Sequence, residues 1–172
     1  PYTLSLHDAL PIYTALILEG PQGLKKSSLI RALVPDVSWF AENLGSDDIA
    51  NKDCMIGLQG RWIVEFAEMS NLRKSEVNAI KSFLTRCVDS YRAPYGRRTE
   101  DHPRQTIFIG SVNPDADGRY LRDSTGGRRF WPVACRTINI DLLLNNRDQL
   151  WAEAVARYND DEPRSEEHTS EL

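Results

Sequence analysis

The chain has 172 residues, which is enough for one domain with a substantial hydrophobic core. Hydrophobic residues make up 41% and charged residues 27%, as in ordinary globular proteins, and no apolar run reaches membrane-spanning length. The formal net charge of −4 excludes a global basic field, so any nucleic-acid site must be local. Cys54, Cys87 and Cys135 lie far apart without zinc or CxxC spacing, which favours free thiols in a reducing, cytoplasmic environment. We expect no membrane partner.

The two ends of the chain differ from the rest in pattern. Residues 1–12 (PYTLSLHDALPI) and 164–172 (RSEEHTSEL) carry no sustained helical or strand period. Both resemble the conceptual translation of sequencing-library adapters, so we interpret them as non-native flanks; the alternative is a pair of disordered tails. The expected core is therefore residues 13–163. Under the first interpretation the natural gene product extends beyond both ends.

The first predicted elements are a strand, a turn and a helix within YTALILEGPQGLKKSSLIRAL, residues 13–33. Residues 15–18 predict a buried strand, residues 20–23 a turn, and the helix opens on Lys26-Ser27. This is the layout of a P-loop, where turn N–H groups and a helix N-terminus surround a phosphate. Lys26 would reach the β- and γ-phosphates of ATP, and Ser27 would hold Mg²⁺. The predicted nucleotide-binding residues are Gly20, Pro21, Gln22, Gly23, Leu24, Lys25, Lys26, Ser27 and Ser28.

Lys25 departs from the P-loop pattern G-x-x-x-x-G-K-[ST]. Gly20, Lys26 and Ser27 match the pattern, but Lys25 stands where it has its second glycine. Glycine tolerates a positive φ and close approach of other backbone, whereas a Cβ crowds the loop. Two interpretations of the motif therefore stay open: a nucleotide site, and a strand-turn-helix with an accidental Lys-Lys-Ser.

Acidic residues follow the second predicted strand. Residues 39–53 predict a short helix and loop, and RWIVEF at 61–66 then predicts a buried strand. Glu65, near the end of that strand, and Glu68 lie where an open α/β sheet places its chemistry, the Walker B position. One acid, for which Glu65 is the candidate, would belong to the Mg²⁺ shell, and a second would polarise the attacking water. The alternative is that both are solvated loop acids.

A basic segment follows the next predicted helix. Residues 75–88 predict that helix, with Ser75 as N-cap and an apolar face that includes Cys87 and Val88. Residues 89–104 (DSYRAPYGRRTEDHPR) then combine arginines and tyrosines around a turn at 94–96. Such a composition suits phosphate contacts and base stacking. The predicted nucleic-acid-binding residues are Arg92, Tyr95, Arg97 and Arg98; the alternative is a solvated hairpin whose arginines pair with Asp89, Glu100 and Asp101.

Further polar candidates flank the last predicted strands. Residues 106–112 predict a buried strand that ends at Asn113, whose amide would bind the attacking water or the γ-phosphate, or else initiate a turn before Pro114. Arg128 and Arg129 precede a predicted strand at 130–133 and are candidates for an arginine finger that reaches a neighbouring subunit's γ-phosphate; surface pairing is the alternative. Residues 140–158 predict one helix or a broken pair, with an apolar stripe assigned to the core.

Five segments resemble, in order and spacing, the virulence-associated E family, P-loop ATPases of phages and mobile elements related to the superfamily-three helicases of the AAA+ group. They are LEGPQGLKKSS, WIVEFAEMS, VNAIKSFLTRCVDSYRAPYGRR, TIFIGSVN and TGGRRFWPV. The resemblance extends from Tyr13 to about Asp160. It implies an α/β, AAA+-like P-loop NTPase with a central, mainly parallel sheet flanked by helices, truncated here at both ends. It also implies assembly into a homo-oligomeric ring.

The same resemblance implies roles for single residues. It puts Lys26 and Ser27 at phosphate and Mg²⁺, and Glu65 and Glu68 at Walker B. It also makes Asn113 sensor 1, and Arg128 and Arg129 candidates for the finger. In the helicase relatives a hairpin between Walker B and sensor 1 lines the central channel, and residues 91–98 occupy that interval. The expected function is Mg²⁺-dependent ATP hydrolysis coupled to single- or double-stranded DNA in a replication protein. The second interpretation, which Lys25 favours, is a catalytically impaired scaffold for DNA binding or oligomerisation.

Overall fold

The computed structural model describes residues 14–44, 49, 51–66, 69, 72–113 and 129–160. Its elements in chain order are β1 (Ala15–Glu19), α1 (Lys26–Leu33), a 3-10 turn (Val37–Trp39), β2 (Phe40–Leu44), α2 (Lys52–Gly57), β3 (Ile63–Phe66), α3 (Lys74–Leu84), β4 (Val88–Tyr91), β5 (Glu100–Pro103), β6 (Ile107–Val112), β7 (Phe130–Ala134) and α4 (Ile140–Asn159). The chain divides into two units, residues 1–138, which hold the sheet, and residues 139–172, which hold α4.

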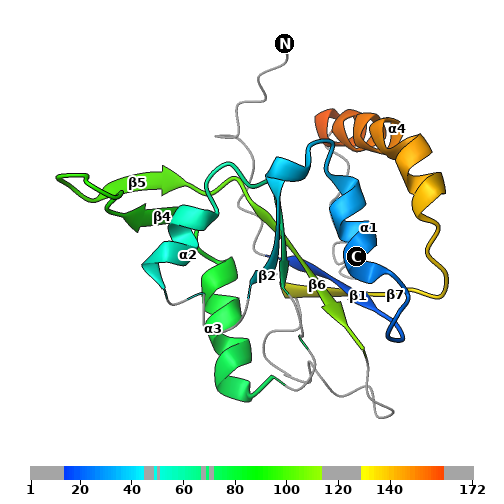
Figure 1. Ribbon diagram of the computed structural model, residues 1–172, viewed down its shortest axis with the longest axis horizontal. Helices are drawn as coiled ribbons and strands as arrows, with labels where there is room; N and C mark the ends of the chain where they lie inside the picture. The colour runs from blue at the N-terminus through cyan, green and yellow to red at the C-terminus, as the bar shows by residue number, and fades with distance from the viewer. Residues whose placement is uncertain are drawn as a thin grey trace, which may run out of the picture. The chain divides into compact units, whose positions relative to one another are not determined.

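The first unit is built on a five-stranded sheet in the order β2-β3-β6-β1-β7 (Figure 1). All four strand pairs in it are parallel. A separate antiparallel pair, β4 and β5, forms a hairpin between α3 and β6. The fold is therefore α/β with a central parallel sheet flanked by helices, as predicted.

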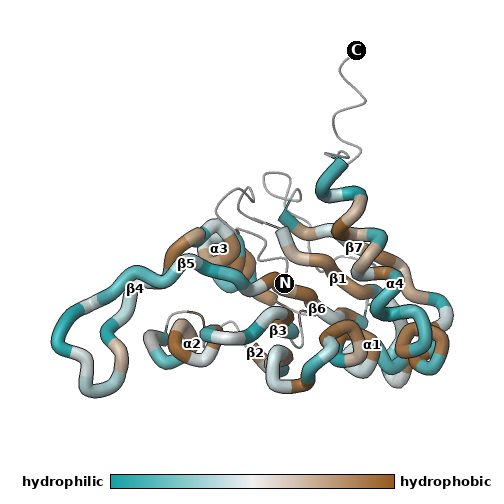
Figure 2. The backbone as a smooth tube through the Cα atoms, turned by 90° about the horizontal axis from the view of Figure 1, so that it is seen from above, coloured by the Kyte–Doolittle hydropathy of each residue, from teal (hydrophilic) through white to brown (hydrophobic). Residues whose placement is uncertain are grey.

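The three middle strands are apolar because both faces of the sheet are covered. β1 reads ALILE, β3 reads IVEF and β6 reads IFIGSV, the near-continuous apolar runs typical of buried parallel strands. Helices α1 and α3 lie on opposite faces of the sheet (Figures 1 and 2). α1 buries Ile30, and α3 buries an apolar stripe formed by Val77, Ile80, Phe83 and Leu84.

An aromatic cluster joins α3 to the sheet. Phe66 of β3, Phe83 of α3 and Phe108 of β6 have ring centroids 5.2 to 6.3 Å apart, and all three are buried. Burial of one such side chain contributes about 1.5–3 kcal/mol. The cluster thus holds α3, and with it the start of the β4–β5 hairpin, firmly against β3 and β6.

β7 forms one edge of the sheet, beside β1. Pro132 lies in the middle of β7, paired with Ile17. Proline cannot donate a ladder hydrogen bond, so within sheets it is confined largely to edges. Beyond β7, the Cys135 N–H donates to the Glu19 carbonyl at 2.7 Å, which brings this segment to the end of β1.

Two predictions about the elements were wrong: one strand was missed, and both ends of one helix were misplaced. The segment predicted as short helix and loop contains β2, because Phe40 and Leu44 pair with Ile63 and Phe66 of β3, a partner more than 20 residues away. Helix α3 begins at Lys74 with Arg73 as its N-cap, so Ser75 is not the cap. It ends at Leu84, and Cys87 and Val88 are exposed beyond it.

The second unit contains α4. Residues 140–159 form one continuous helix, but its apolar stripe is not core, since no residue of α4 is buried. Leu150, Val155 and Tyr158 are 48%, 41% and 39% exposed. A single helix cannot cover its own stripe, and α4 is the one helix of its unit among the described residues. Within the described ranges, none of the helices combines the length and apolarity that a membrane crossing requires.

Candidate functional site

The carboxyl ends of β1, β3 and β6 meet at one edge of the sheet, because the three strands are parallel and β6 lies between the other two. The turn at residues 20–25 follows β1, Glu65 lies near the end of β3, and Asn113 follows β6. Two hydrogen bonds join them: Lys26 Nζ donates to Asn113 Oδ1 at 2.7 Å, and Ser27 Oγ donates to Glu65 Oε1 at 2.7 Å. Residues separated by up to 87 positions thus form one polar cluster.

Lys26 lies at the centre of this cluster. Its side chain comes from the first turn of α1 and is only 7% exposed. Besides Asn113, its ammonium donates to the carbonyls of Gly20 at 2.7 Å and Pro21 at 3.0 Å, which accounts for all three of its protons. Burial lowers the pKa of Lys26 below its ordinary value of 10.5, while Cys135 and Glu65 act in the opposite direction. Cys135 as a neighbour of this lysine was not predicted from the sequence.

Glu65 is also buried, at 2% exposure, and is held by two hydroxyls. Its Oε1 accepts from Ser27 Oγ at 2.7 Å and from Ser111 Oγ at 2.8 Å. Ser111 is thus a further member of the cluster, and it was not predicted from the sequence. The strand period could have predicted it, because Ser111 precedes Asn113 by two residues and residues i and i+2 of a strand share one face.

The loop from Gly20 to Lys25 has the tight backbone of a glycine-rich turn. A Cβ on Gly20 would lie 2.8 Å from the Cys135 carbonyl oxygen, so this position requires glycine. Gly23 has φ of +82° and Lys25 has φ of 66° with ψ of 32°, both in the left-handed region. Lys25 therefore retains the backbone conformation that glycine favours, as the N-cap residue of α1.

The donors of this cluster suit magnesium better than zinc. Among the described residues there is no group of three or more His, Cys, Asp or Glu side chains arranged for a metal. Mg²⁺ keeps several waters and uses one or two carboxylates together with substrate phosphates. One buried carboxylate beside a serine hydroxyl, as in Glu65 and Ser27, fits that pattern.

Arg129, one of the two candidates for an arginine finger, does not join the cluster. Arg129 is half-buried and directly precedes β7, whose first residue, Phe130, pairs with Ala15 at the start of β1. It therefore lies at the amino edge of the sheet, opposite the edge that holds Lys26. Glu68 and Arg128 lie outside the described residues.

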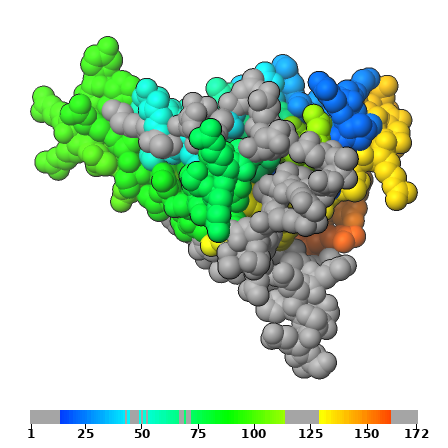
Figure 3. All heavy atoms as spheres, turned by 90° about the horizontal axis from the view of Figure 1, so that it is seen from below, coloured from blue at the N-terminus to red at the C-terminus, as the bar shows by residue number. Residues whose placement is uncertain are grey.

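The basic hairpin projects from the body of the first unit (Figure 3). Arg92, Arg97 and Arg98 are exposed at its tip and form no ion pair with any described residue. Tyr95 is fully exposed in the turn, with φ of 64°. The four residues predicted to bind nucleic acid therefore lie together on one projection.

The root of the hairpin is held by a buried ion pair. Arg104 Nε donates to Asp89 Oδ2 at 2.9 Å, Nη2 donates to Asp89 Oδ1, and Nη1 donates to the Phe83 carbonyl at 2.6 Å. The two side chains are 5% and 1% exposed, and the guanidinium lies 4.3 Å above the Phe83 ring. The pairing alternative is therefore correct for Arg104, at the root, and not for the arginines at the tip.

Solved structures with a similar fold include three of the apo C-terminal region of NrS-1. Their TM-scores are 0.55, 0.52 and 0.56, at sequence identities of 18%, 19% and 18%. The matches cover 80%, 80% and 81% of this chain, and this chain spans only 35%, 34% and 36% of theirs. At such identities the likeness establishes the fold. No curated protein sequence matches the chain.

A family model assigns the chain to a protein family, which structural similarity at these identities does not do. The model of the virulence-associated protein E-like domain matches residues 9–172, which is nearly the whole chain. The matched range includes every strand and helix described above and all the members of the polar cluster. The chain therefore belongs to the virulence-associated protein E-like domain family.

Proposed function

We propose that this chain is the ATP-binding and ATP-hydrolysing module of a phage or mobile-element replication protein, acting on DNA in the presence of Mg²⁺. One observation carries the proposal: the two hydrogen bonds Lys26–Asn113 and Ser27–Glu65 bring the ends of three parallel strands to one point. A cation, a hydroxyl, a carboxylate and an amide at the carboxyl edge of such a sheet are the groups that phosphoryl transfer needs. Family membership supports the replication setting.

Each member of the cluster has a distinct part in the proposal. Lys26 binds a phosphate oxygen in place of one of its three present hydrogen-bond acceptors. Asn113 is the acceptor that can give way, because it accepts through its side chain and the other two acceptors are backbone carbonyls. Ser27 and Glu65 would hold Mg²⁺, which would neutralise phosphate charge when bound. Ser111 keeps the Glu65 carboxylate oriented. Asn113 then positions the attacking water, and Glu68 is the candidate that polarises it.

A ring of identical subunits would complete the site. Arg129 lies at the amino edge of the sheet, whereas the phosphate cluster lies at the carboxyl edge. An arginine on that edge can stabilise transition-state charge only on a neighbouring subunit's nucleotide. This separation supports the proposed homo-oligomer.

Nucleotide titration of the purified chain, with and without Mg²⁺, tests the proposal. Lys26→Ala should abolish ATP binding, and Ser27→Ala should remove most of its dependence on Mg²⁺. Lys74→Ala, at the exposed first position of α3, is the matched lysine control and should bind as the parent does. Failure of both the parent and Lys25→Gly to bind ATP with Mg²⁺ would overturn the nucleotide site.

The second candidate function is a P-loop scaffold without efficient hydrolysis, and the left-handed conformation of Lys25 favours it. An L-residue with a bulky side chain at this point of the loop competes for space beside the phosphates. The two candidates separate in one comparison. The scaffold function would be supported if the parent chain binds DNA and self-associates without binding ATP, and if the Lys25→Gly variant does bind ATP.

The DNA part of the proposal rests on the tip of the hairpin. Alanine at Arg92, Arg97 or Arg98 should weaken binding of single-stranded DNA and reduce the salt slope by about 0.7 for each phosphate that is no longer neutralised. Arg31→Ala, an exposed arginine of α1, should change neither quantity. Binding that stays the same in all three hairpin variants would exclude the tip as the DNA contact.

A further inference from the structure

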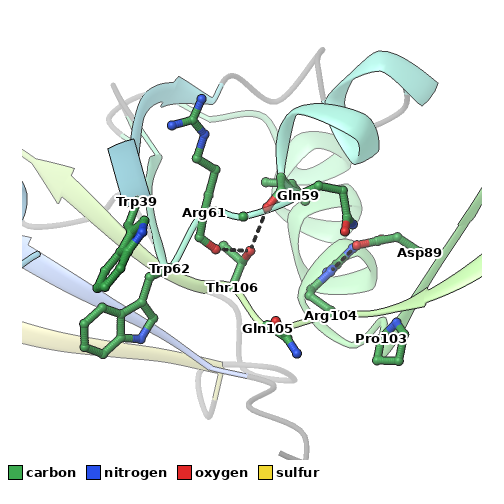
Figure 4. Close-up of a pocket in the computed structure, with 11 residues that line it drawn as sticks. Trp39, Gln59, Arg61, Trp62, Asp89, Pro103, Arg104, Gln105 and Thr106 are labelled. Atoms are coloured by element: carbon green, nitrogen blue, oxygen red, sulfur yellow. Dashed lines mark hydrogen bonds and ion pairs between the residues drawn. The ribbon is translucent and has the colours of Figure 1, made fainter. Parts of the chain in front are cut away.

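A cavity of about 240 Å³ lies at the amino edge of the sheet (Figure 4). Trp39, Trp62 and Thr106, which line it, directly precede β2, β3 and β6. Since the strands are parallel and the P-loop follows the carboxyl end of β1, the cavity and Lys26 lie at opposite edges. The cavity is therefore separate from the proposed nucleotide site.

One wall of the cavity is aromatic. Trp39 and Trp62 pack edge to face, with ring centroids 5.9 Å apart and an interplanar angle of 65°. Figure 4 shows both indoles on one side of Thr106, with Pro103, Arg104 and Asp89 on the other. Trp39 is 42% exposed, so part of a large aromatic surface stays open to a ligand. Such a surface stacks on flat, apolar rings.

The polar side chains that line the cavity include two amides and Arg61, a cation that no acid among the described lining residues neutralises. Gln59 and Gln105 are exposed and line the cavity. Arg61 also lines it, and its Nη1 donates to the Ser38 carbonyl. The carboxylate of Asp89 is already bound by Arg104. An aromatic wall, hydrogen-bonding amides and a net positive charge together match a nucleobase attached to phosphate, because amides read base edges and rings stack on base faces.

The cavity is continuous with the basic hairpin. Asp89 of β4, Pro103 of β5 and Arg104 belong both to the hairpin and to the cavity wall. A four-residue strand spans about 13 Å, a distance that the backbone of a few nucleotides covers. We propose that the cavity binds one unstacked base of a single-stranded nucleic acid whose phosphates contact the arginines at the hairpin tip. This inference rests on the proposed role of the hairpin and adds to it a site for a base.

The test compares a short oligothymidylate with an abasic oligonucleotide of equal length, each titrated into the parent chain with tryptophan fluorescence as the readout. The parent should bind the base-bearing strand more tightly. Trp39→Ala should reduce the affinity for that strand about tenfold and leave the affinity for the abasic one unchanged. Trp39→Phe should restore most of the affinity, since phenylalanine keeps a stacking face.

Matched variants separate the cavity from the hairpin and from general damage. Trp131→Ala removes another half-exposed tryptophan, 41% exposed on β7 and outside the cavity, and should leave both affinities unchanged. Gln105→Ala changes an exposed residue that is no part of the core, and should weaken only the base-bearing strand. Arg97→Ala should weaken both strands equally.

The outcomes distinguish failure of this inference from failure of the proposed function. Equal affinity of the parent for both strands would overturn the base site and leave phosphate binding by the hairpin intact. If Trp39→Ala still binds the base-bearing strand more tightly than the abasic strand, by the same factor as the parent, base recognition lies outside the cavity. No binding of either strand at low salt would overturn the cavity and the DNA contact together. A free mononucleotide that binds as tightly as the oligonucleotide would assign the cavity to a soluble nucleotide instead of a strand.

Discussion

Lys25 carries a backbone conformation that is unfavourable for its own side chain. Its φ of 66° costs an L-residue about 1–2 kcal/mol, whereas glycine avoids this strain and costs about 0.5–1 kcal/mol in conformational entropy. Because the strain is the larger amount, Lys25→Gly should raise the free energy of unfolding by about 0.5–1 kcal/mol. Urea denaturation measures this change. A decrease in stability would mean that the Lys25 side chain makes compensating contacts.

The same substitution should act on the proposed hydrolysis. A second ammonium beside a polyphosphate is attractive, but a shift of Lys26 by about 1 Å can cost about 100-fold in rate, so geometry should dominate. We expect weak ATP binding and slow hydrolysis in the parent and an increase in both for Lys25→Gly. Lys26→Ala in the glycine background should abolish them again. A parent as fast as Lys25→Gly would show that the loop tolerates lysine.

Burial of Lys26 predicts a dependence of stability on pH. Its pKa in the folded chain is lowered from 10.5, so between the two values the unfolded chain binds more protons. The free energy of unfolding of the parent should therefore rise, relative to that of Lys26→Met, as pH increases through this window toward 10.5. Denaturant unfolding of both proteins across alkaline pH measures the difference. A difference that does not change with pH would contradict the prediction.

At the scale of the elements, the hairpin has arginines with two different tasks. Arg104 pairs with Asp89 in the interior, and removing one partner of such a pair costs about 3–5 kcal/mol because a buried charge is left alone. Arg97, of the same residue type and in the same connection between α3 and β6, is exposed, and its removal should change stability by no more than about 0.5 kcal/mol. Thermal and urea unfolding of Arg104→Ala and Arg97→Ala measure the contrast.

A double variant gives the control for that contrast. Asp89→Ala combined with Arg104→Ala removes both charges, so it should be less destabilised than the sum of the single variants. Strict additivity would mean that the two side chains act independently, against the contacts between them.

At the scale of the whole molecule, we expect residues 1–12 and 164–172 to contribute little, because neither segment supplies a periodic apolar face. Both lie outside the described residues. Deleting them together should leave the melting temperature unchanged. In a chain of this length a destabilisation of about 1 kcal/mol lowers Tm by about 2–4 °C, so a fall of that size in calorimetry would assign them to the fold.

The two edges of the sheet divide the proposed tasks between them. The carboxyl edge holds Lys26, Glu65 and Asn113, and the amino edge holds the cavity at Trp39 and Trp62. Strand β6 connects the edges, since Arg104 and Thr106 precede it and Asn113 follows it. A single strand thus links the root of the hairpin to the polar cluster.

Local chemistry in the sequence was enough to predict β1, the turn after it, α1, β3 and β6. Each strand is an apolar run, and the strand, turn and helix of residues 15–33 form one continuous segment whose glycine and lysine spacing predicts the turn. The meeting of Lys26, Glu65 and Asn113 also followed, because parallel strands bring their carboxyl ends to a common edge. These features could be predicted because each depends on the residue pattern of its own segment and on the general rule for parallel strands.

The remaining features depend on partners distant in the chain, so no local pattern could reveal them. β2 exists because Phe40 pairs with Ile63, and α3 stops at Leu84 as the chain turns to place Asp89 against Arg104. The position of Arg129 at the edge opposite the polar cluster follows from the register of β7 on β1. The cavity, too, forms only where the starts of three strands and the root of the hairpin come together. Packing between distant segments sets these features, because the free energy that stabilises them arises only when those segments meet.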